Sequence, residues 1–410
     1  MEQKPVTVIG GGFSGLVTAY YLVQAGFDVR LFEKEARWGG LLGTHYEPWG
    51  LVETAANGIL NSFELHDLAK NIGVRLLPTR LESRNRYIYR NGPKRWPLTL
   101  SESLNLVRSL VRALMKGKAG FAPQTNETLG HWAERLFGEE VLRYFIEPGQ
   151  QGIFAGDVRE LSAELILKPP SRERGFKRSQ GHYHRGTVAP EKGMQQFVDQ
   201  LVAFLREKGV EMVLNADPEL GTEPNHPHVL CVGPQAAAKI LKSSDPHLSA
   251  QLKNLDLLPL ASLTMHFDKN EGTLKGFGCL FPRDQGIRSL GVLFNRYIFS
   301  GRTEAHTETW ILGGALDREI ADAPEWEIVH AALADREKLY GRRVEPLHTK
   351  LTVWPKAIPH YDLGLKEFLG DLTEPKNILL NGNYMGGIGL SRILQRAKNI
   401  AEQLGASSEF

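Results

Sequence analysis

Short apolar runs and a helical repeat alternate at the start of the chain. Residues 6–9 are a β-branched run of the kind found in buried parallel strands, and residues 29–32 are predicted to form a second strand. Between them, apolar positions at helical spacing extend over 16–25, and Gly26 follows as a helix-stop signal. The pattern predicts a strand–helix–strand unit, and with it a parallel sheet and an α/β fold.

The turn between the first strand and the helix is rich in glycine. Gly10, Gly12 and Gly15 have the spacing G-x-G-x-x-G directly after a strand and before a helix. The first glycine permits the tight turn, the second lets a pyrophosphate approach the backbone, and the third allows close helix–strand packing. Glu33 ends the second strand, where a carboxylate binds ribose hydroxyls. The segment predicts a dinucleotide-binding turn, with an unrelated glycine-rich turn as the alternative.

The residues that follow Glu33 distinguish between nucleotides. Glu33, Arg37, Gly39 and Gly40 form the pattern E-x-x-x-R-x-G-G, which resembles the continuation of this motif in FAD proteins of the amine-oxidase superfamily. The resemblance implies that Arg37 neutralises the pyrophosphate and that Gly39 and Gly40 let the backbone lie against the flavin. FAD is therefore the expected cofactor.

The C-terminal end of the chain carries a second signal of the same kind. Residues 377–380 have strand character, a glycine-rich turn follows over 381–389, and helical spacing begins at Leu390. The turn resembles the C-terminal flavin motif of the superfamily, which implies cofactor contacts from Asn383, Gly387, Ile388 and Gly389. Because the stretch contains no cysteine, we expect noncovalent FAD, held in one domain that both ends of the chain build.

Composition narrows the classes of protein that fit. The 410 residues suggest two or three structural units, and Lys+Arg 49 against Asp+Glu 47 gives a net charge of +2, with no global attraction to nucleic acid. Cys231 and Cys279 are too few for a disulfide framework, and no paired His/Cys spacing predicts a metal site. We find no signal-peptide pattern and no apolar stretch of about 18 residues that would span a bilayer. A cytoplasmic protein is expected.

Several segments between the two flavin motifs resemble the protoporphyrinogen/coproporphyrinogen oxidases of the same superfamily. The matching segments lie in the family's order, at 53–58, 85–92, 127–162, 190–194, 276–282, 312–314 and 354–361. The resemblance implies an FAD-dependent oxidase of haem biosynthesis that dehydrogenates a porphyrinogen by hydride transfer to flavin N5. Oxygen or another acceptor would reoxidise the flavin. One departure is the segment 216–228, which is shorter than the β-hairpin usual in the family.

The resemblance also assigns residues to the site. Arg86 matches an arginine that anchors a substrate propionate, while Phe277, Leu280 and Ile311 match apolar residues around the macrocycle. Gly156 would bring backbone near the reactive face of the flavin. Asn57 would hydrogen-bond a pyrrole N–H. Further cofactor contacts are implied for Phe13, Ser14, Lys34 and Trp354.

Other readings of these residues stay open at this stage. Arg86 lies in an arginine-rich stretch and could be an ordinary surface residue; the apolar positions could be core, and the glycine and asparagine could be turn residues. Two other functions fit the same fold: an amine oxidase or isoprenoid desaturase of the superfamily, and a tetrapyrrole carrier without turnover.

The expected architecture is a discontinuous Rossmann-like FAD-binding domain with a mixed-sheet substrate domain and a helical insertion. We assign residues to the FAD-binding domain (1–75, 187–235, 354–410), the substrate domain (76–96, 236–353) and the insertion (97–186). Within the insertion, 104–115 has apolar positions around Arg108 and Arg112. This amphipathic helix is expected to pack on its own domain, and peripheral contact with a membrane surface is the alternative.

Overall fold

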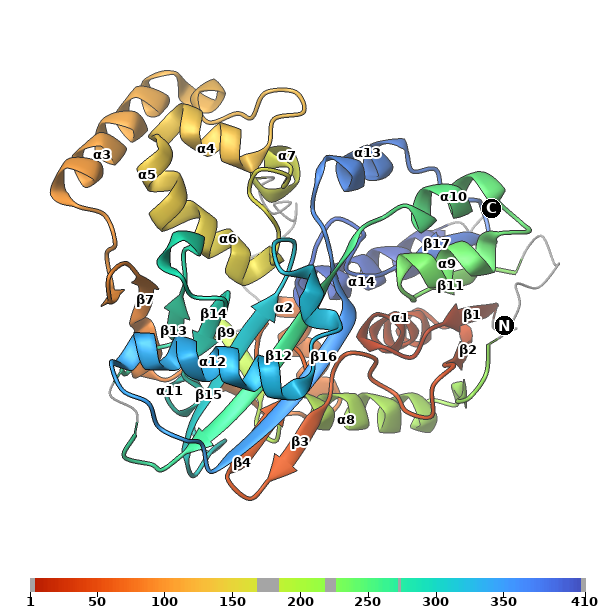
Figure 1. The fold of residues 1–410 in the computed structure, drawn as a ribbon. Helices are drawn as coiled ribbons and strands as arrows, with labels where there is room; N and C mark the ends of the chain where they lie inside the picture. The colour runs from red at the N-terminus through yellow and green to blue at the C-terminus, as the bar shows by residue number, and fades with distance from the viewer. Residues whose placement is uncertain (1–3, 168–183, 218–225, 272–273, 407–410) are drawn as a thin grey trace. The chain divides into compact units, whose positions relative to one another are not determined.

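The computed structural model describes residues 4–167, 184–217, 226–271 and 274–406. The chain passes back and forth between two units (Figure 1). Unit 1 is made of Met1–Thr79, Gly181–Leu255 and Phe368–Phe410, and unit 2 of Arg80–Gln180 and Asp256–Glu367. The fold is mixed α/β.

A five-stranded parallel sheet forms the centre of unit 1, in the order β10–β2–β1–β11–β17. These strands are β10 (Glu211–Val213), β2 (Asp28–Phe32), β1 (Pro5–Ile9), β11 (His228–Leu230) and β17 (Ile378–Leu380). Since all five are parallel, their carboxyl ends lie at one edge of the sheet, the edge at which open α/β sheets bind ligands.

Four helices of unit 1 bury apolar faces in a common core with this sheet. They are α1 (Phe13–Gln24), α2 (Phe63–Asn71), α8 (Met194–Glu207) and α14 (Leu390–Ala406). The unit also contains α9 (Pro234–Leu241) and α10 (Pro246–Lys253), which pack against each other. Helix α1 packs against α14, so segments from both ends of the chain lie together. The smaller sheets are β3 (Thr44–Glu47) with β4 (Gly50–Glu53), and β5 (Ile59–Leu60), β9 (Thr187–Pro190) and β6 (Leu76–Pro78).

A seven-stranded mixed sheet, in the order β16–β12–β15–β14–β13–β7–β8, forms the centre of unit 2. The strands are β16 (His348–Pro359), β12 (Leu257–Phe267), β15 (His306–Gly313), β14 (Gly291–Leu293), β13 (Gly278–Leu280), β7 (Arg86–Tyr89) and β8 (Pro93–Lys94). Strands β7 and β13 are parallel, and the other pairs are antiparallel. Phe281 stacks on Trp310 in its core, with ring centroids 5.6 Å apart.

The helices of unit 2 come mainly from one long stretch of chain. They are α3 (Leu100–Met115), α4 (Leu129–Phe137), α5 (Glu139–Val141), a π-helical turn (Leu142–Ile146), α6 (Glu147–Phe154), α7 (Ala163–Leu167), α11 (Asn295–Ile298) and α12 (Glu325–Tyr340). Helix α13 (Leu363–Asp371) crosses from one unit to the other along the chain. Short 3-10 turns cover Leu81–Arg84, Gly117–Gly120, Arg283–Gln285 and Arg318–Ala321.

Element boundaries differ from the sequence-based ones in three places. Helix α1 begins at Phe13 rather than at residue 16, so the last glycine of the motif is already helical. The expected domain boundary at 353/354 falls inside β16, and that at 235/236 falls inside α9, which begins with a proline at its first turn. Regular elements continue across both positions, and the compact units divide at 255/256 and 367/368 instead.

Helix α3 contradicts the expectation that its apolar positions pack on their own domain. It begins at Leu100, where Thr99 and Glu102 form a reciprocal capping box. Leu106 packs against the neighbouring helices, but most of the other large apolar side chains are exposed, by 36% to 91%. Within the described residues, none of the helices is both long enough and apolar enough to cross a bilayer.

Candidate functional site

The glycine-rich turn joins β1 to α1 in unit 1. Gly10 has φ +107°, and a Cβ there would lie 2.5 Å from the carbonyl oxygen of Cys231. A Cβ at Gly15 would overlap the carbonyl oxygen of Gly10. At Gly12 the nearest atom to a Cβ would be Gly40 Cα, at 3.7 Å, so space is open beside this residue. Two of the glycines are required by the fold, and the third leaves room for a ligand.

The first turn of α1 is suited to an anion. Gly12 is its N-cap, no side chain caps the helix, and no acidic residue lies in the first turn. The first backbone N–H groups of a helix have no partner within the helix and carry the positive end of its dipole. A pyrophosphate at this position would accept their hydrogen bonds.

Glu33 is buried against the glycine-rich turn. Its Oε2 accepts a hydrogen bond from the Gly11 N–H at 2.6 Å, and its Oε1 accepts one from the Glu35 N–H at 2.9 Å. Each carboxylate oxygen can accept a second bond, so the fixed carboxylate fits the predicted contact with ribose hydroxyls. The neighbouring Lys34 is exposed and forms an ion pair with Glu35 at 3.5 Å.

The second motif lies directly on the first. The Gly39 N–H donates to the carbonyl oxygen of Gly11 at 2.9 Å. Arg37 donates to the carbonyl oxygens of Gly40 and, at 3.1 Å, Leu42. The guanidinium therefore fixes the 38–42 backbone beside the turn, and its contact with pyrophosphate stays a prediction.

Trp38 also belongs to this site, although it was not among the predicted site residues. Its ring lies against Gly11, and a Cβ at Gly11 would clash with it. The Trp38 Nε1 is buried and has no hydrogen-bond partner among the described residues. An unpaired buried donor beside an uncapped helix end fits an oxygen-rich cofactor such as FAD. The Trp38–Gly11 contact joins residues distant in sequence, so no local motif indicates it.

Phe13 and Ser14 sit in the first turn of α1. The Phe13 side chain is in the core, with its ring centroid 6.0 Å from that of Phe197, so only its backbone faces a cofactor. Ser14 Oγ donates to the carbonyl oxygen of Cys231 at 3.2 Å. Burial raises the pKa of the Cys231 thiol to about 12, so this cysteine is not a nucleophile.

The C-terminal turn is fastened to the same edge of the sheet. The Asn381 N–H donates to the carbonyl oxygen of Leu230 at 3.0 Å, and its Nδ2 donates to Thr18 Oγ1 of α1 at 2.9 Å. A Cβ at Gly387 would clash with the side chain of Arg392. The structure thus brings the turns after β1 and β17 to one edge. The predicted contacts in the second turn are Asn383 and Ile388, both half-buried, Gly387, and the exposed Gly389.

Asn57 lies in a bend of unit 1 and is half-buried, with Nδ2 3.5 Å from the carbonyl oxygen of Ala55. Glu53, four residues earlier, is buried and accepts hydrogen bonds from Thr44 Oγ1 at 2.6 Å and from the Met194 N–H at 3.2 Å. This carboxylate caps the start of α8, and it therefore supports the segment that leads to Asn57.

The residues predicted to bind substrate lie on neighbouring strands of unit 2. Arg86 is paired in register with Gly278, and its guanidinium lies 4.8 Å from the ring centroid of Phe277. Leu280, Gly291 and Ile311 are register partners across β13, β14 and β15. We call the row Leu280–Gly291–Ile311 the apolar row; a Cβ at Gly291 would lie 3.1 Å from Leu280 Cδ2, so the Leu280 side chain covers this glycine.

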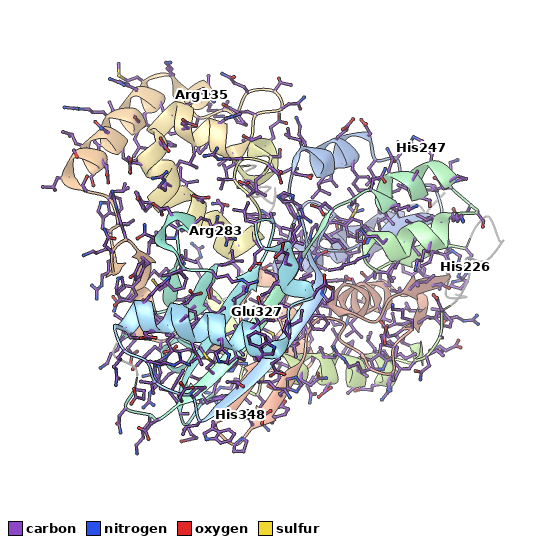
Figure 2. All side chains as sticks on the ribbon, viewed as in Figure 1. Arg135, His226, His247, Arg283, Glu327 and His348 are labelled. Carbon is purple, nitrogen blue, oxygen red and sulfur yellow. The ribbon has the colours of Figure 1, made fainter. Side chains whose placement is uncertain are left out.

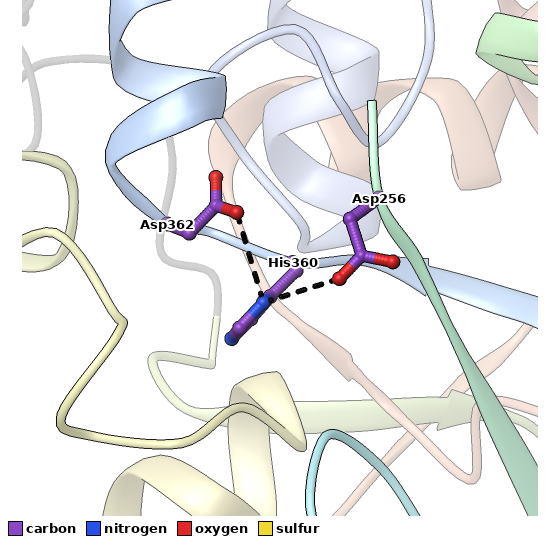
Figure 3. Close-up of side chains that lie close together, drawn as sticks. All are labelled: Asp256, His360 and Asp362. Carbon is purple, nitrogen blue, oxygen red and sulfur yellow. Dashed lines mark ion pairs between the residues drawn. The ribbon is translucent and has the colours of Figure 1, made fainter. Parts of the chain in front are cut away.

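Gly156 follows α6, and its position excludes any side chain. A Cβ there would lie 2.6 Å from Leu161 Cδ2 and 3.1 Å from Cδ2 of His360. His360 is buried, and its Nδ1 faces Asp256 Oδ2 at 3.4 Å and Asp362 Oδ2 at 3.8 Å (Figure 3).

These two carboxylates and His360 lie close enough together to bind a metal ion, but Asp256 already has a cationic partner. Arg318 donates two hydrogen bonds to the Asp256 carboxylate, at 2.9 and 2.6 Å, and thereby lowers the pKa of Asp256. The group is consistent with an ion-pair network that supports the Gly156 turn.

Trp354 lies in the middle of β16, opposite Leu260, and belongs to unit 2. The sequence-based assignment placed it in the FAD-binding domain, because the strand could not be distinguished from the start of the C-terminal flavin segment. The expected β-hairpin departure covers 216–228, of which 218–225 lie outside the described residues.

Comparison with known proteins identifies the family. The family model for flavin-containing amine oxidoreductases matches residues 13–217 and 221–393. The chain is 26% identical to the mitochondrial protoporphyrinogen oxidase of Nicotiana tabacum, over 98% of this chain and 94% of that one. It is 23% identical to the coproporphyrinogen III oxidase of Bacillus subtilis, over 94% and 93% of the two chains.

Solved structures agree on the fold. A crystal structure from Exiguobacterium sp. 255-15, which carries a provisional protoporphyrinogen oxidase name, has a TM-score of 0.78 at 20% identity and covers 99% of this chain and 100% of that one. The glycine-rich turn, the buried Glu33 and the open space beside Gly12 fit the flavin dinucleotide. The chain therefore belongs to the family of flavin-containing amine oxidoreductases, and FAD is its cofactor.

Proposed function

We propose that this protein is an FAD-dependent oxidase that dehydrogenates a porphyrinogen to the porphyrin in haem biosynthesis. The observation that carries the proposal is the similarity along nearly the whole chain to relatives named protoporphyrinogen and coproporphyrinogen oxidases. The arrangement of Arg86, Phe277 and the apolar row on adjacent strands supports it, because it combines a carboxylate-binding cation with apolar surface.

The substrate dictates what the chain has to supply. A porphyrinogen is a large, mostly apolar macrocycle with anionic propionate groups, so it needs an apolar surface with a cation at its margin. Arg86 would bind a propionate through paired N–H donors, and Phe277 and the apolar row would contact the pyrrole rings. Bound FAD supplies a hydride acceptor at N5 for the methylene bridge. The Gly156 backbone and Asn57 would orient the substrate, and water or the flavin could accept the pyrrole proton.

An anaerobic half-reaction tests the activity. Without oxygen, protoporphyrinogen or coproporphyrinogen added to the holoprotein should bleach the flavin absorbance, because each bound FAD accepts two of the six electrons that the substrate loses. When oxygen is then admitted, porphyrin fluorescence should appear faster than it does by autoxidation without the protein. A carrier without turnover would bind porphyrin tightly but leave the flavin oxidised. An amine oxidase would release hydrogen peroxide with polyamines; against this alternative, Tyr384, the aromatic residue of the C-terminal turn, is fully buried.

Substitution of Arg86 by alanine should weaken substrate binding more than FAD retention. A hydrogen-bonded charge contributes roughly 1.5–3 kcal/mol, so KM should rise about 10- to 100-fold. Arg75→Ala serves as the control, because Arg75 is an exposed arginine with one surface ion pair. Equal losses of substrate binding and of FAD in Arg86→Ala would mark Arg86 as a structural residue instead.

We also propose that α3 contacts an anionic membrane surface. The exposed apolar side chains of α3 follow one another at helical spacing: Leu100, Leu104, Val107, Val111, Leu114 and Met115. The cations nearby are Arg108, Arg112, Lys116 and Lys118. Glu102, the acidic residue of the helix, is bound by Arg90 at 2.6 Å. A helix with an apolar stripe and unopposed positive charge suits an interface with anionic lipid.

Vesicle sedimentation tests this contact. The protein should sediment with vesicles that contain phosphatidylglycerol and not with pure phosphatidylcholine, and high salt should weaken the binding. Leu104→Ser with Val111→Ser should reduce binding at least about tenfold, because two apolar contacts are lost. Leu347→Ser removes an exposed apolar side chain elsewhere and is the control. No sedimentation with either lipid would refute the contact.

A further inference from the structure

Arg283 is a half-buried arginine just after β13 in unit 2 (Figure 2), and within the described part of the chain it has no ion-pair partner. Its Nη1 donates to the carbonyl oxygen of Arg288 at 3.4 Å, while its Nε is buried without a partner. Burial lowers the pKa of Arg283, yet a guanidinium remains charged in proteins. A partly buried cation without a direct ion pair is unfavourable, so a bound anion would stabilise it.

The acidic groups closest to Arg283 do not neutralise it fully. Asp317 attracts it but is held by Arg288 through two hydrogen bonds, at 2.9 and 3.1 Å. Glu147 and Asp157 also act on Arg283. Burial raises the pKa of Glu147, and Asp157 raises it further, so the charged form of Glu147 is disfavoured. None of these carboxylates lies within ion-pair distance of Arg283 among the described residues, and its Nε has no hydrogen-bond partner there.

Helix α6 lies close to the apolar row and to the chain around Arg283. Leu280, three residues earlier, packs against α6, because a Cβ at Gly152 would lie 2.6 Å from Leu280 Cδ2. The residue after Arg283, Asp284, accepts a hydrogen bond at Oδ2 from the Tyr144 hydroxyl at 2.8 Å, shortly before α6 begins. Helix α6 therefore lies beside both Leu280 and the turn that carries Arg283.

Arg86, on the neighbouring strand β7, and Arg283 lie near opposite ends of β13. Arg86 is the register partner of Gly278, where β13 begins. The chain stays extended past β13, since the Phe281 N–H donates to the carbonyl oxygen of Leu290 at 3.2 Å and Pro282 has φ −60° and ψ 146°. At a rise of roughly 3.3 Å per residue, Gly278 and Arg283 are about 16 Å apart.

We propose that Arg283 binds a second substrate carboxylate, opposite the one at Arg86, and that the enzyme consequently prefers coproporphyrinogen III to protoporphyrinogen IX. The inference rests on the proposed function. Coproporphyrinogen III carries a propionate on each of its four pyrroles and can present carboxylates to both ends of the strand. Protoporphyrinogen IX carries its two propionates on neighbouring pyrroles and has vinyl groups on the others. It can therefore place a carboxylate at only one end of β13.

Steady-state kinetics with both porphyrinogens tests the inference on the FAD-loaded protein. The wild type should have the higher kcat/KM with coproporphyrinogen III. Arg283→Met keeps the length of the side chain and removes its charge. It should lower kcat/KM for coproporphyrinogen III about 10- to 100-fold more than for protoporphyrinogen IX, the loss expected for one charged hydrogen-bonding group. Arg283→Lys, which keeps the charge, should recover part of the preference.

Binding of the porphyrin products separates this inference from the proposed function. Fluorescence titrations with coproporphyrin III and protoporphyrin IX need no turnover. If neither porphyrinogen is oxidised, the proposed function fails, while a selective loss of coproporphyrin III binding in Arg283→Met would still support the carboxylate site. Equal losses for both porphyrins, no loss, or a wild-type preference for protoporphyrinogen IX would overturn it. Arg343→Met, at an exposed arginine paired with Glu345, is the matched control and should change neither ratio.

Discussion

Replacement of Gly12 with alanine is expected to remove FAD from the protein without unfolding it. Gly12 has φ −70°, which any residue adopts, and an added Cβ would touch Gly40 Cα at an ordinary 3.7 Å. The methyl group would instead occupy the space where a pyrophosphate approaches the uncapped start of α1. Loss of one charge-assisted hydrogen bond weakens binding about 10- to 100-fold. Flavin content after purification and the Kd of FAD for the apoprotein measure the effect.

Two further glycine variants make this result interpretable. Gly405→Ala, in α14 of the same unit, meets no atom within 4 Å and should retain full flavin content. Gly15→Ala places its Cβ on the carbonyl oxygen of Gly10 and should lose both flavin and thermal stability. A Gly12→Ala protein that binds FAD as tightly as wild type would show that the dinucleotide does not pass over this turn.

The part of the site that is local in sequence could be predicted. The spacing of Gly10, Gly12 and Gly15 after a strand defines both a backbone conformation and a ligand, since the tight turn and the close helix approach each exclude a side chain. The buried carboxylate of Glu33 follows from the same unit, because its strand is the register neighbour of β1. FAD binding and the α/β fold could therefore be predicted from a few short segments.

Contacts between distant residues could not be predicted. The sequence does not indicate that Trp38 would cover Gly11, or that Asn381 would be tied to Thr18 of α1. Two expected domain boundaries fall inside regular elements for a related reason. A local pattern suggests where an element lies, but membership of a unit depends on pairing, and β16 continues to Pro359 because β12 pairs with it along that length.

Helix α3 shows the limit of amphipathic periodicity. The pattern predicted a helix over 104–115, and the structure begins that helix earlier, at Leu100, after the capping box of Thr99 and Glu102. The same pattern does not predict whether the apolar stripe contacts protein, lipid or water, because it indicates only the side of the helix on which the apolar residues lie.

Replacement of Glu308 with alanine should strongly destabilise unit 2. Glu308 is fully buried, and its Oε2 accepts hydrogen bonds from Trp310 Nε1 at 3.0 Å and from Arg336 Nε at 3.1 Å. Its Oε1 lies 2.8 Å from His306 Nε2. Without the carboxylate, the buried Arg336 guanidinium would have no counter-ion, a loss of roughly 3–5 kcal/mol. Urea unfolding of the wild type and the variant measures the change in the free energy of unfolding.

A double variant separates the buried charge from simple loss of packing. Glu308→Met with Arg336→Met removes both charges at similar volume and should be markedly more stable than Glu308→Ala, since buried ion pairs are often replaced by apolar residues at little cost. Glu345→Ala breaks the exposed pair with Arg343 and should cost at most about 1 kcal/mol.

The same cluster predicts how unit 2 responds to acid. Burial by itself would raise the pKa of Glu308, but the hydrogen bond from His306 and the charge of Arg336 outweigh it and lower that pKa. A carboxyl whose pKa is lower in the folded state stabilises the fold above its unfolded pKa, and this contribution is lost as the pH falls through the folded value. The stability difference between wild type and Glu308→Ala should therefore be largest near neutral pH and shrink in acid. A difference that stayed constant down to strongly acidic pH would mean that ionised Glu308 does not stabilise the unit, and that the cost of the substitution comes from the cavity alone.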